Sequence, residues 1–375
     1  MKFSCTRDNL STALAVVSGV LGKPGHLPIL SSVLLEATET GVRLRATDLE
    51  MAITAQVRAR VESVGVEAVP GKTMADFVNL LSANQIDIEL VENEIKIICG
   101  TSSAKIKGTS ADEFPVIPDM EEGQPYLLPA DKFRQALSQT LVAVARNEIR
   151  PELTGVYLAI GSERYEGLVL AATDSYRLAE KRLKTEPYHE PVTCIVPGRT
   201  VAEIVRLIST ARAVGVVEEN IRLWFSKNQI GLKFGMIEMV SRLLEGSYPD
   251  YAQIIPTQFC TSVSFPIEVF VKKVRAASLF TTAGVNAVVV DVKAEVGVVC
   301  LSSTSTQTGE QTGEVEAKVE GQENSILLNH KYIIDGLQQL EGEEAVLQMN
   351  SGDAPCVFRG KEDTSYVYIV MPIRQ

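Results

Sequence analysis

The residues of this chain that could perform chemistry are a PGKT string at 70–73, two Thr-Asp pairs and three histidines. A phosphate-binding loop of the form GxxxxGKT needs a glycine at position 66, which is Val66. Asp48 and Asp174 recur at matching places in two similar segments, which is more typical of a turn or cap than of a catalytic group. The histidines form no HExxH zinc motif: they are His26, His189 and His330. The sequence therefore gives no positive support for an enzyme, a metal site or a bound cofactor.

A repeated motif shows how these residues are organised along the chain. VPGKTMADFVNLL recurs twice, the second time more weakly, and the three copies stand at 69–81, 196–208 and 328–340. The spacing is far longer than the period of a solenoid, so the repeated unit is a whole domain. The sequence predicts three copies of one domain, with boundaries at 1–121, 122–256 and 257–375.

Each copy is expected to open with a short strand and a helix, followed by strands, a second helix and more strands. In the first copy the helices are predicted at 7–20 and 72–82. A hairpin is predicted after the second helix of each copy, with turns at Glu92 and Asn93, at Lys227 and Asn228, and at Ser351 to Ala354. The pattern indicates an α+β protein with antiparallel sheets.

Composition bounds the class of protein. The 375 residues are 45% hydrophobic, which is enough for several cores. Six cysteines lie far apart without a CxxC pair, as expected for reduced thiols in a cytosolic protein. The first residues, MKFSCTRDNL, contain no apolar signal segment, so we expect neither export nor membrane insertion and place the protein in the cytoplasm.

A basic residue stands near the start of the repeated helix in each copy. These residues are Lys72, Arg199 and Lys331. A cation there faces the positive end of the helix dipole, so another interaction should favour it. One interpretation is an ion pair four residues on, with Asp76, Glu203 and Asp335 respectively. The alternative is a row of positive charge that serves a function.

The net charge of −11 argues against a protein that coats nucleic acid with a basic surface. Further basic residues nevertheless fall on the exposed sides of predicted helices, among them Lys132, Arg134, Arg146 and Arg150 in the second copy. In the third copy they are Lys272, Lys273 and Arg275. Such a chain could enclose nucleic acid if these helices faced inward and the acidic sheets faced outward.

Several motifs resemble those of a known family. They are LPIL at 27–30, TDLEM at 47–51, ATDSYRLA at 172–179, YPDY at 248–251 and the terminal YIVMPIRQ. Together with the three domains they are similar to the β subunit of bacterial DNA polymerase III, the sliding clamp, and the resemblance spans the whole chain. It implies three clamp domains in each of two chains, joined head to tail in a six-domain ring whose helices line a hole for duplex DNA.

The resemblance gives the basic residues a role. A closed ring need not hold DNA tightly, so weak phosphate contacts suffice for sliding. The residues expected to face DNA are Lys23, Lys72, Lys132, Arg134, Arg146, Arg150, Arg199, Arg206, Lys272, Lys273, Arg275 and Lys331.

Closing such a ring needs complementary ends on each chain. The predicted strand 104–108 carries Lys105 and Lys107, whereas a predicted strand at 310–320 carries Glu310, Glu314, Glu316 and Glu320. The family also suggests an apolar contact from Leu279 and Phe280 to Ile106.

The resemblance further implies a pocket in which polymerases and the clamp loader insert a short hydrophobic peptide. It maps to Leu153, Thr173, Ser175, Tyr176, Arg177, Leu178, Pro249, Ile254, Val370, Met371, Pro372, Ile373 and Arg374. Ser175 and Tyr176 stand where the family often has Gly and His, and Gln253 where Arg occurs, which leaves the preferred peptide motif open.

The expected function is that of a non-catalytic processivity factor. It would tether DNA polymerase III and other replication or repair proteins to duplex DNA, with no cofactor of its own. Two alternatives remain: a three-domain enzyme that binds nucleotide through PGKT, and a scaffold that forms no closed ring.

Overall fold

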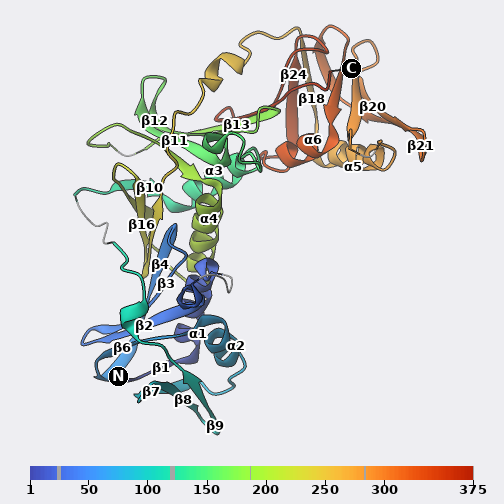
Figure 1. Ribbon diagram of the computed structural model, residues 1–375. Coiled ribbons are helices and arrows are strands. Elements are labelled where there is room, and N and C mark those ends of the chain that lie inside the picture. The colour runs from blue at the N-terminus through green and yellow to red at the C-terminus, as the bar shows by residue number, and fades with distance from the viewer. Residues whose placement is uncertain (23–26, 119–122, 186, 283, 375) are drawn as a thin grey trace. The chain divides into compact units, whose positions relative to one another are not determined.

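The computed structural model describes residues 1–22, 27–118, 123–185, 187–282 and 284–374. By its internal contacts the chain forms two compact units, one made of 1–134 with 203–243 and the other of 135–202 with 244–375. Helices α3 (Ala130–Leu141) and α4 (Gly198–Ala213) carry the chain from one unit to the other. Each unit has its own sheets and helices (Figure 1).

The first unit contains two sheets whose paired strands are antiparallel. The five-stranded sheet has the order β5 (Ala59–Ser63), β1 (Lys2–Thr6), β7 (Gln85–Val91), β8 (Glu94–Cys99) and β9 (Ser102–Lys107). The eight-stranded sheet has the order β10 (Tyr126–Pro129), β15 (Asn220–Phe225), β16 (Gln229–Phe234), β17 (Ile237–Arg242), β4 (Met51–Val57), β3 (Gly41–Thr47), β2 (Ser32–Thr38) and β6 (Gly65–Pro70). The larger sheet therefore joins strands of the first and second sequence repeats.

The second unit repeats this plan with the second and third repeats. Its nine-stranded sheet has the order β14 (Val192–Pro197), β11 (Gly155–Ser162), β12 (Tyr165–Thr173), β13 (Arg177–Leu183), β26 (Tyr366–Val370), β25 (Cys356–Gly360), β24 (Glu344–Met349), β18 (Thr261–Pro266) and β22 (Lys318–Gly321). Its four-stranded sheet has the order β21 (Gly309–Glu316), β20 (Val298–Ser305), β19 (Ala287–Lys293) and β23 (Asn324–Asn329).

Helices pack in pairs against these sheets. In the first unit α1 (Arg7–Val17) contacts α2 (Gly71–Asn79), and in the second α5 (Ile267–Ser278) contacts α6 (His330–Leu337), as Figure 1 shows. The α1 helix begins where Thr6 Oγ1 accepts a hydrogen bond from Asn9 N at 3.3 Å. Its buried residues are spaced for one apolar face: Leu10, Ala13, Leu14, Val16 and Val17.

The expected strand-and-helix opening is present in all three repeats, as β1–α1, β10–α3 and β18–α5. The three predicted hairpins are also confirmed, and they are β7–β8, β15–β16 and β24–β25. Short 3-10 segments stand at Ser18–Val20, Pro28–Ser31, Ala111–Glu113, Pro151–Thr154 and Tyr251–Ile254.

The expected bounds of two elements need correction. The first helix ends at Val17 and continues to Val20 only as a 3-10 turn. The predicted strand at 310–320 is broken near Ala317, and its two parts, β21 and β22, belong to different sheets. Glu320 therefore does not lie on the same strand as Glu314.

Arg146 and Arg150 do not lie on a helix, contrary to the prediction. The α3 helix ends at Leu141, after which Ala143 N and Val144 N donate to carbonyl oxygens three residues back. These tighter bonds end the helix, and both arginines are exposed in the segment that follows it.

Candidate functional sites

A tight turn between β12 and β13 carries several residues of the expected peptide pocket. Thr173 Oγ1 donates to Arg177 O at 2.7 Å and accepts from Ser175 N at 3.1 Å. Asp174 Oδ1 accepts from both Tyr176 N and Arg177 N at 3.0 Å. Ser175 has a φ of 75°, in the left-handed region. The Thr-Asp pair therefore organises a turn, as its repetition in the sequence indicated.

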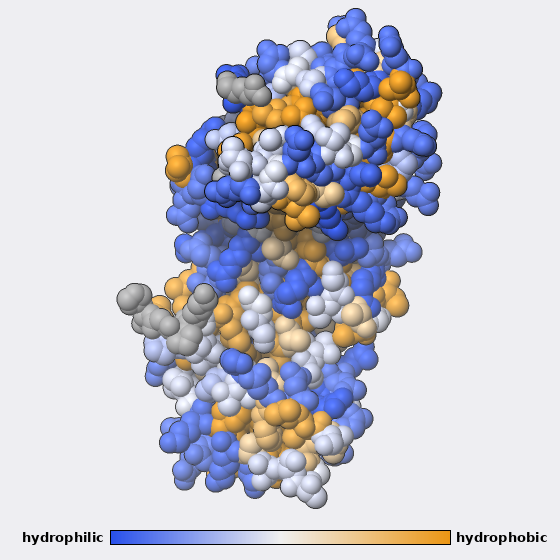
Figure 2. Space-filling model, turned by 90° about the vertical axis from the view of Figure 1, so that its right-hand side faces the viewer, coloured by the Kyte–Doolittle hydropathy of each residue, from blue (hydrophilic) through white to orange (hydrophobic). Residues whose placement is uncertain are grey.

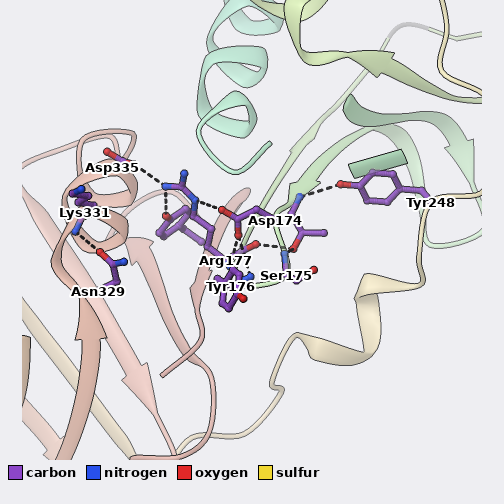
Figure 3. A network of polar contacts seen from close by, with 10 residues as sticks. Asp174, Ser175, Tyr176, Arg177, Tyr248, Asn329, Lys331 and Asp335 are labelled. Carbon is purple, nitrogen blue, oxygen red and sulfur yellow. Dashed lines mark hydrogen bonds and ion pairs between the residues drawn. The ribbon is translucent and has the colours of Figure 1, made fainter. Parts of the chain in front are cut away.

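Arg177 connects this turn to the third repeat. Its side chain is only 5% exposed, and its guanidinium lies 3.0 Å from Asp174 Oδ2 and 2.7 Å from Asp335 Oδ2 on α6 (Figure 3). It also lies 4.5 Å from the centre of the Tyr332 ring. Burial alone would lower the pKa of Arg177, but Tyr368 and the two carboxylates raise it above its ordinary value. The guanidinium therefore stays charged at the seam between β13 and α6.

The C-terminal tail is held beside the same turn. β26 pairs with β13, and the residue after β26 continues the contact because Met371 N donates to Tyr176 O at 2.9 Å. Farther along, Ile373 N donates to Leu327 O at 2.8 Å. The turn and the tail, far apart in sequence, are thereby brought together.

The YPDY segment completes this group. Tyr248 Oη accepts a hydrogen bond from Thr173 N at 3.0 Å, which ties the YPDY segment to the turn (Figure 3). Burial raises the pKa of the Tyr248 hydroxyl, so it stays neutral. The YPDY motif was noted in the sequence, but Tyr248 itself was not chosen as a site residue, and neither were Tyr332 and Asp335.

The predicted pocket residues differ in exposure. Leu153, Thr173, Arg177, Leu178 and Val370 are buried, whereas Tyr176 is 64% and Ile254 is 40% exposed. Ser175 and Arg374 are exposed, and Pro249, Met371, Pro372 and Ile373 are half-buried. The exposed and half-buried members are the ones that a ligand could contact.

The ion pair expected at the start of the repeated helix is present in the first repeat. Lys72 Nζ lies 2.8 Å from Asp76 Oδ2, with both side chains largely exposed. In the second repeat Glu203 binds Arg206, and in the third Asp335 binds Arg177. The three helices therefore use the same acidic position in different ways.

Arg206 has a structural role within its unit. Its guanidinium donates to Ala15 O at 3.1 Å and to Val16 O at 2.5 Å, near the end of α1, and to the carboxylate of Glu203. This arginine satisfies carbonyl groups of a neighbouring helix, so it has fewer donors to offer a phosphate.

The other basic residues expected to face DNA lie mostly on the surface. Exposed members are Lys72, Lys132, Arg146, Arg150, Arg199, Lys272, Arg275 and Lys331. Arg134 and Lys273 are half-buried. Lys272 is paired with Glu268 on α5 at 2.5 Å. Lys23 lies outside the described residues.

The charged strands predicted for the dimer interface lie at sheet edges. β9 is the last strand of its sheet, with Lys105 and Lys107 exposed on one face, whereas Ile106 between them is buried in its own unit. β21 is the edge of the four-stranded sheet and exposes Glu310, Glu314 and Glu316. Near the end of α5, Leu279 is 71% exposed and Phe280 is half-buried.

One face of the molecule presents several separate groups of apolar side chains (Figure 2). Figure 2 shows hydrophobic groups separated by hydrophilic ones on the face that it presents. A specific contact on that face would therefore rely on small apolar groups and backbone pairing.

The residues that the structure describes contain neither a metal-binding cluster nor a membrane-spanning helix. Within those ranges no cluster of three or more His, Cys, Asp or Glu side chains is arranged to hold a metal ion. No helix in the same part of the chain is long and apolar enough to span a membrane.

Comparison with known proteins decides the family. Models of the N-terminal, central and C-terminal domains of the DNA polymerase III beta subunit match residues 1–118, 127–250 and 252–374. The chain belongs to this family. It is 31% identical over 388 residues to a beta sliding clamp of Staphylococcus aureus, covering 100% of this chain and 99% of the relative.

Solved structures agree with this assignment. A DNA polymerase sliding clamp from Bacillus subtilis is 26% identical with a TM-score of 0.92, covering 100% of this chain and 99% of that one. The beta subunit from Streptococcus pyogenes, 22% identical, has a TM-score of 0.93 with full coverage of both chains and shows the same fold.

Membership in the family confirms several expectations. The chain is a sliding clamp of DNA polymerase III, a non-catalytic subunit that acts in DNA replication, and it consists of three tandem clamp domains. The nucleotide-binding enzyme considered as an alternative is therefore set aside.

Proposed function

We propose that two copies of this clamp close into a ring through β9 of one chain and β21 of the other. The internal repeats support this pairing. Within the chain the last strand of the second repeat, β17, pairs antiparallel with β4, and the last strand of the third, β26, pairs antiparallel with β13. β9 is the last strand of the first repeat. β21 is the strand of the third repeat that is equivalent to β4 in the first and β13 in the second. By the same rule β9 would pair with β21, and both strands lie at sheet edges within one chain.

The charges on the two strands also favour pairing of β9 with β21. The exposed face of β9 carries Lys105 and Lys107, whereas that of β21 carries Glu310, Glu314 and Glu316. Opposite charges promote association of the two edges, and like charges oppose β9–β9 or β21–β21 pairing. Backbone hydrogen bonds would supply the contact, and Leu279 with Phe280 would add apolar area beside it.

In this ring the basic residues of the helices, together with Arg146 and Arg150 in the segment after α3, would face duplex DNA. Single lysines and arginines make phosphate contacts that carry no sequence information, so the ring can move along the duplex while its closure prevents escape. The described candidates are Lys72, Lys132, Arg134, Arg146, Arg150, Arg199, Lys272, Lys273, Arg275 and Lys331. Arg206 contributes less, because its donors are used within the protein.

The turn at Thr173–Arg177, Pro249 and the tail at Val370–Arg374 would form the partner pocket. Half-buried Met371 and Pro372 beside the exposed Tyr176 offer an apolar surface to a short hydrophobic peptide. We expect the catalytic subunit of DNA polymerase III, other polymerases and the clamp loader to use it. We expect the clamp to act with these partners in the cytoplasm.

Retention on DNA circles tests the ring. Purified clamp is loaded onto nicked circular DNA with its loader and ATP at moderate salt, and bound clamp is measured before and after the circles are cut. A ring remains on circles and slides off linear ends. Equal retention on both forms would mean direct binding and would contradict encirclement, while absence from circles in the presence of an active loader would favour a scaffold that forms no ring.

A further inference from the structure

The first unit contains a cavity of about 380 Å³ that none of the predicted sites includes. It lies where the turn between β3 and β4 meets the segment before the second repeat and the ends of β16 and β17. Its lining is formed by Thr47, Leu49, Glu50, Met51, Ala52, Pro115, Val116, Ile117, Pro118, Gln229, Val240, Ser241 and Arg242.

The turn in this cavity has the same hydrogen bonds as the turn at Thr173–Arg177. Thr47 Oγ1 donates to Met51 O at 2.9 Å and accepts from Leu49 N at 3.0 Å. Asp48 Oδ1 accepts from Glu50 N at 3.1 Å and from Met51 N at 2.8 Å. Leu49 has a φ of 76°, against 75° for Ser175. Position by position, the two turns are copies of one structure.

The strands that follow are equivalent as well. β4 pairs with β17 so that Met51 faces Ser241, just as Arg177 in β13 faces Val370 in β26. The last residue of β17, Arg242, donates its N–H to Glu50 O at 2.9 Å. In the second unit Met371 N donates to Tyr176 O at the same distance. The cavity is therefore the counterpart, at the first domain junction, of the partner pocket at the second.

Its lining suits an uncharged apolar ligand. Leu49 is 46% and Val116 is 96% exposed, and Met51 is buried. The two charged lining side chains, Glu50 and Arg242, lie 3.7 Å apart as an exposed ion pair. The cavity thus carries no net charge, which complements a neutral apolar segment.

Met51 accounts for the main difference between the junctions. At the equivalent position Arg177 forms ion pairs with Asp174 and Asp335 and lies over the ring of Tyr332. A methionine there makes no ion pair and presents a flexible apolar chain, which adapts to ligands of different shape. The buried side chain beneath the turn is therefore apolar at the first junction and charged at the second.

We propose that the cavity around Leu49, Met51 and Val116 is a second docking site for a short apolar peptide segment of a partner protein. The class of ligand rests on the proposed function of the equivalent pocket, whereas the site itself rests on its own geometry. A clamp with both sites could hold two partner segments on each chain.

Methionine methyl groups provide a separate reporter for each site. The full-length clamp is labelled with ¹³C at its methionine methyls, and the Met51 and Met371 signals are assigned with Met51→Leu and Met371→Leu. The neutral dipeptide N-acetyl-leucyl-phenylalanine amide is then titrated in. Both signals should shift, and Leu49→Asp should weaken the affinity reported by Met51 by about tenfold or more, since docking would desolvate the new carboxylate.

Controls and outcomes separate the two proposals. Val296→Asp changes a valine that is 70% exposed elsewhere and should leave both titrations unchanged. A shift of Met371 with no shift of Met51 would overturn the second site and leave the partner pocket intact. A shift of Met51 alone would support the second site and count against the partner pocket. Equal shifts of Met51 with N-acetyl-seryl-asparagine amide, or shifts caused by protein concentration alone, would contradict a site for apolar peptides.

Discussion

The guanidinium of Arg177 lies 2.7 Å from Oδ2 of Asp335, so a strand of the second repeat is tied to a helix of the third. Asp174 and Tyr332 hold the same guanidinium from its other sides. The turn assigned to the proposed partner pocket therefore carries a buried charge whose partners come from two sequence repeats.

Replacing Arg177 by alanine should destabilise the seam between β13 and β26. Removing one member of a buried ion pair leaves the others without a partner, which costs roughly 3 kcal/mol. Arg177→Lys should fall between the wild type and alanine, because an ammonium cannot keep both carboxylate contacts and the ring contact. Amide hydrogen exchange of the two strands measures the loss, with the exposed Arg275→Ala as control. Unchanged protection in Arg177→Ala would show that the network contributes no stability.

Deleting residues 371–375 should abolish stimulation of DNA polymerase III while leaving the clamp dimeric. The deletion removes the backbone hydrogen bonds of Met371 and Ile373 and the apolar surface beside Tyr176, but no residue of β9 or β21. Primer-extension length and sedimentation are measured on the same preparation. Arg374→Ala, which changes an exposed side chain at the end of the tail, is the milder control. Loss of both properties would make the tail a structural element instead.

Reversing charge on β21 should weaken the dimer. Glu314→Lys together with Glu316→Lys places lysines opposite Lys105 and Lys107, and adding Lys105→Glu with Lys107→Glu to the same chain should restore association. Sedimentation at low and high salt measures both effects, and the defect should shrink as salt screens the charges.

Glu320→Lys is the matched control for the charge reversal, because this exposed glutamate lies on β22 in a different sheet. A dimer defect as large in Glu320→Lys as in the β21 variant would contradict the assignment of the interface to β21.

The thiols should divide sharply in reactivity. Burial raises the pKa of Cys5, Cys194 and Cys356 to about 12, so these thiols are almost entirely protonated at pH 8. Cys260 is exposed. Iodoacetamide at pH 8 should modify Cys260 first and reach the buried Cys5 and Cys356 only after unfolding, as peptide mass spectrometry would record. Early alkylation of Cys356 would mean that β25 and β26 separate in the native protein.

Much of the architecture was predictable from local sequence signals. The repeated helix motif indicated three domains because each copy must bury the same apolar face, and the hairpins followed from alternating apolar residues around short polar turns. The Thr-Asp pairs were recognisable as turns because their bonds join residues two to four positions apart. Family motifs located the tail and the YPDY segment.

The partners of individual side chains were decided only by the tertiary structure. Asp335 stands four residues after Lys331, which suggested an ion pair along the helix, but folding brings the buried Arg177 to it from another domain. Glu203 likewise binds Arg206, whose remaining donors contact α1. Helical spacing specifies which residues share a face, whereas the identity of a partner depends on which distant strand or helix is packed there. The equivalence of the two domain junctions became visible for the same reason: it resides in the pairing of β4 with β17 and of β13 with β26, which no local pattern records.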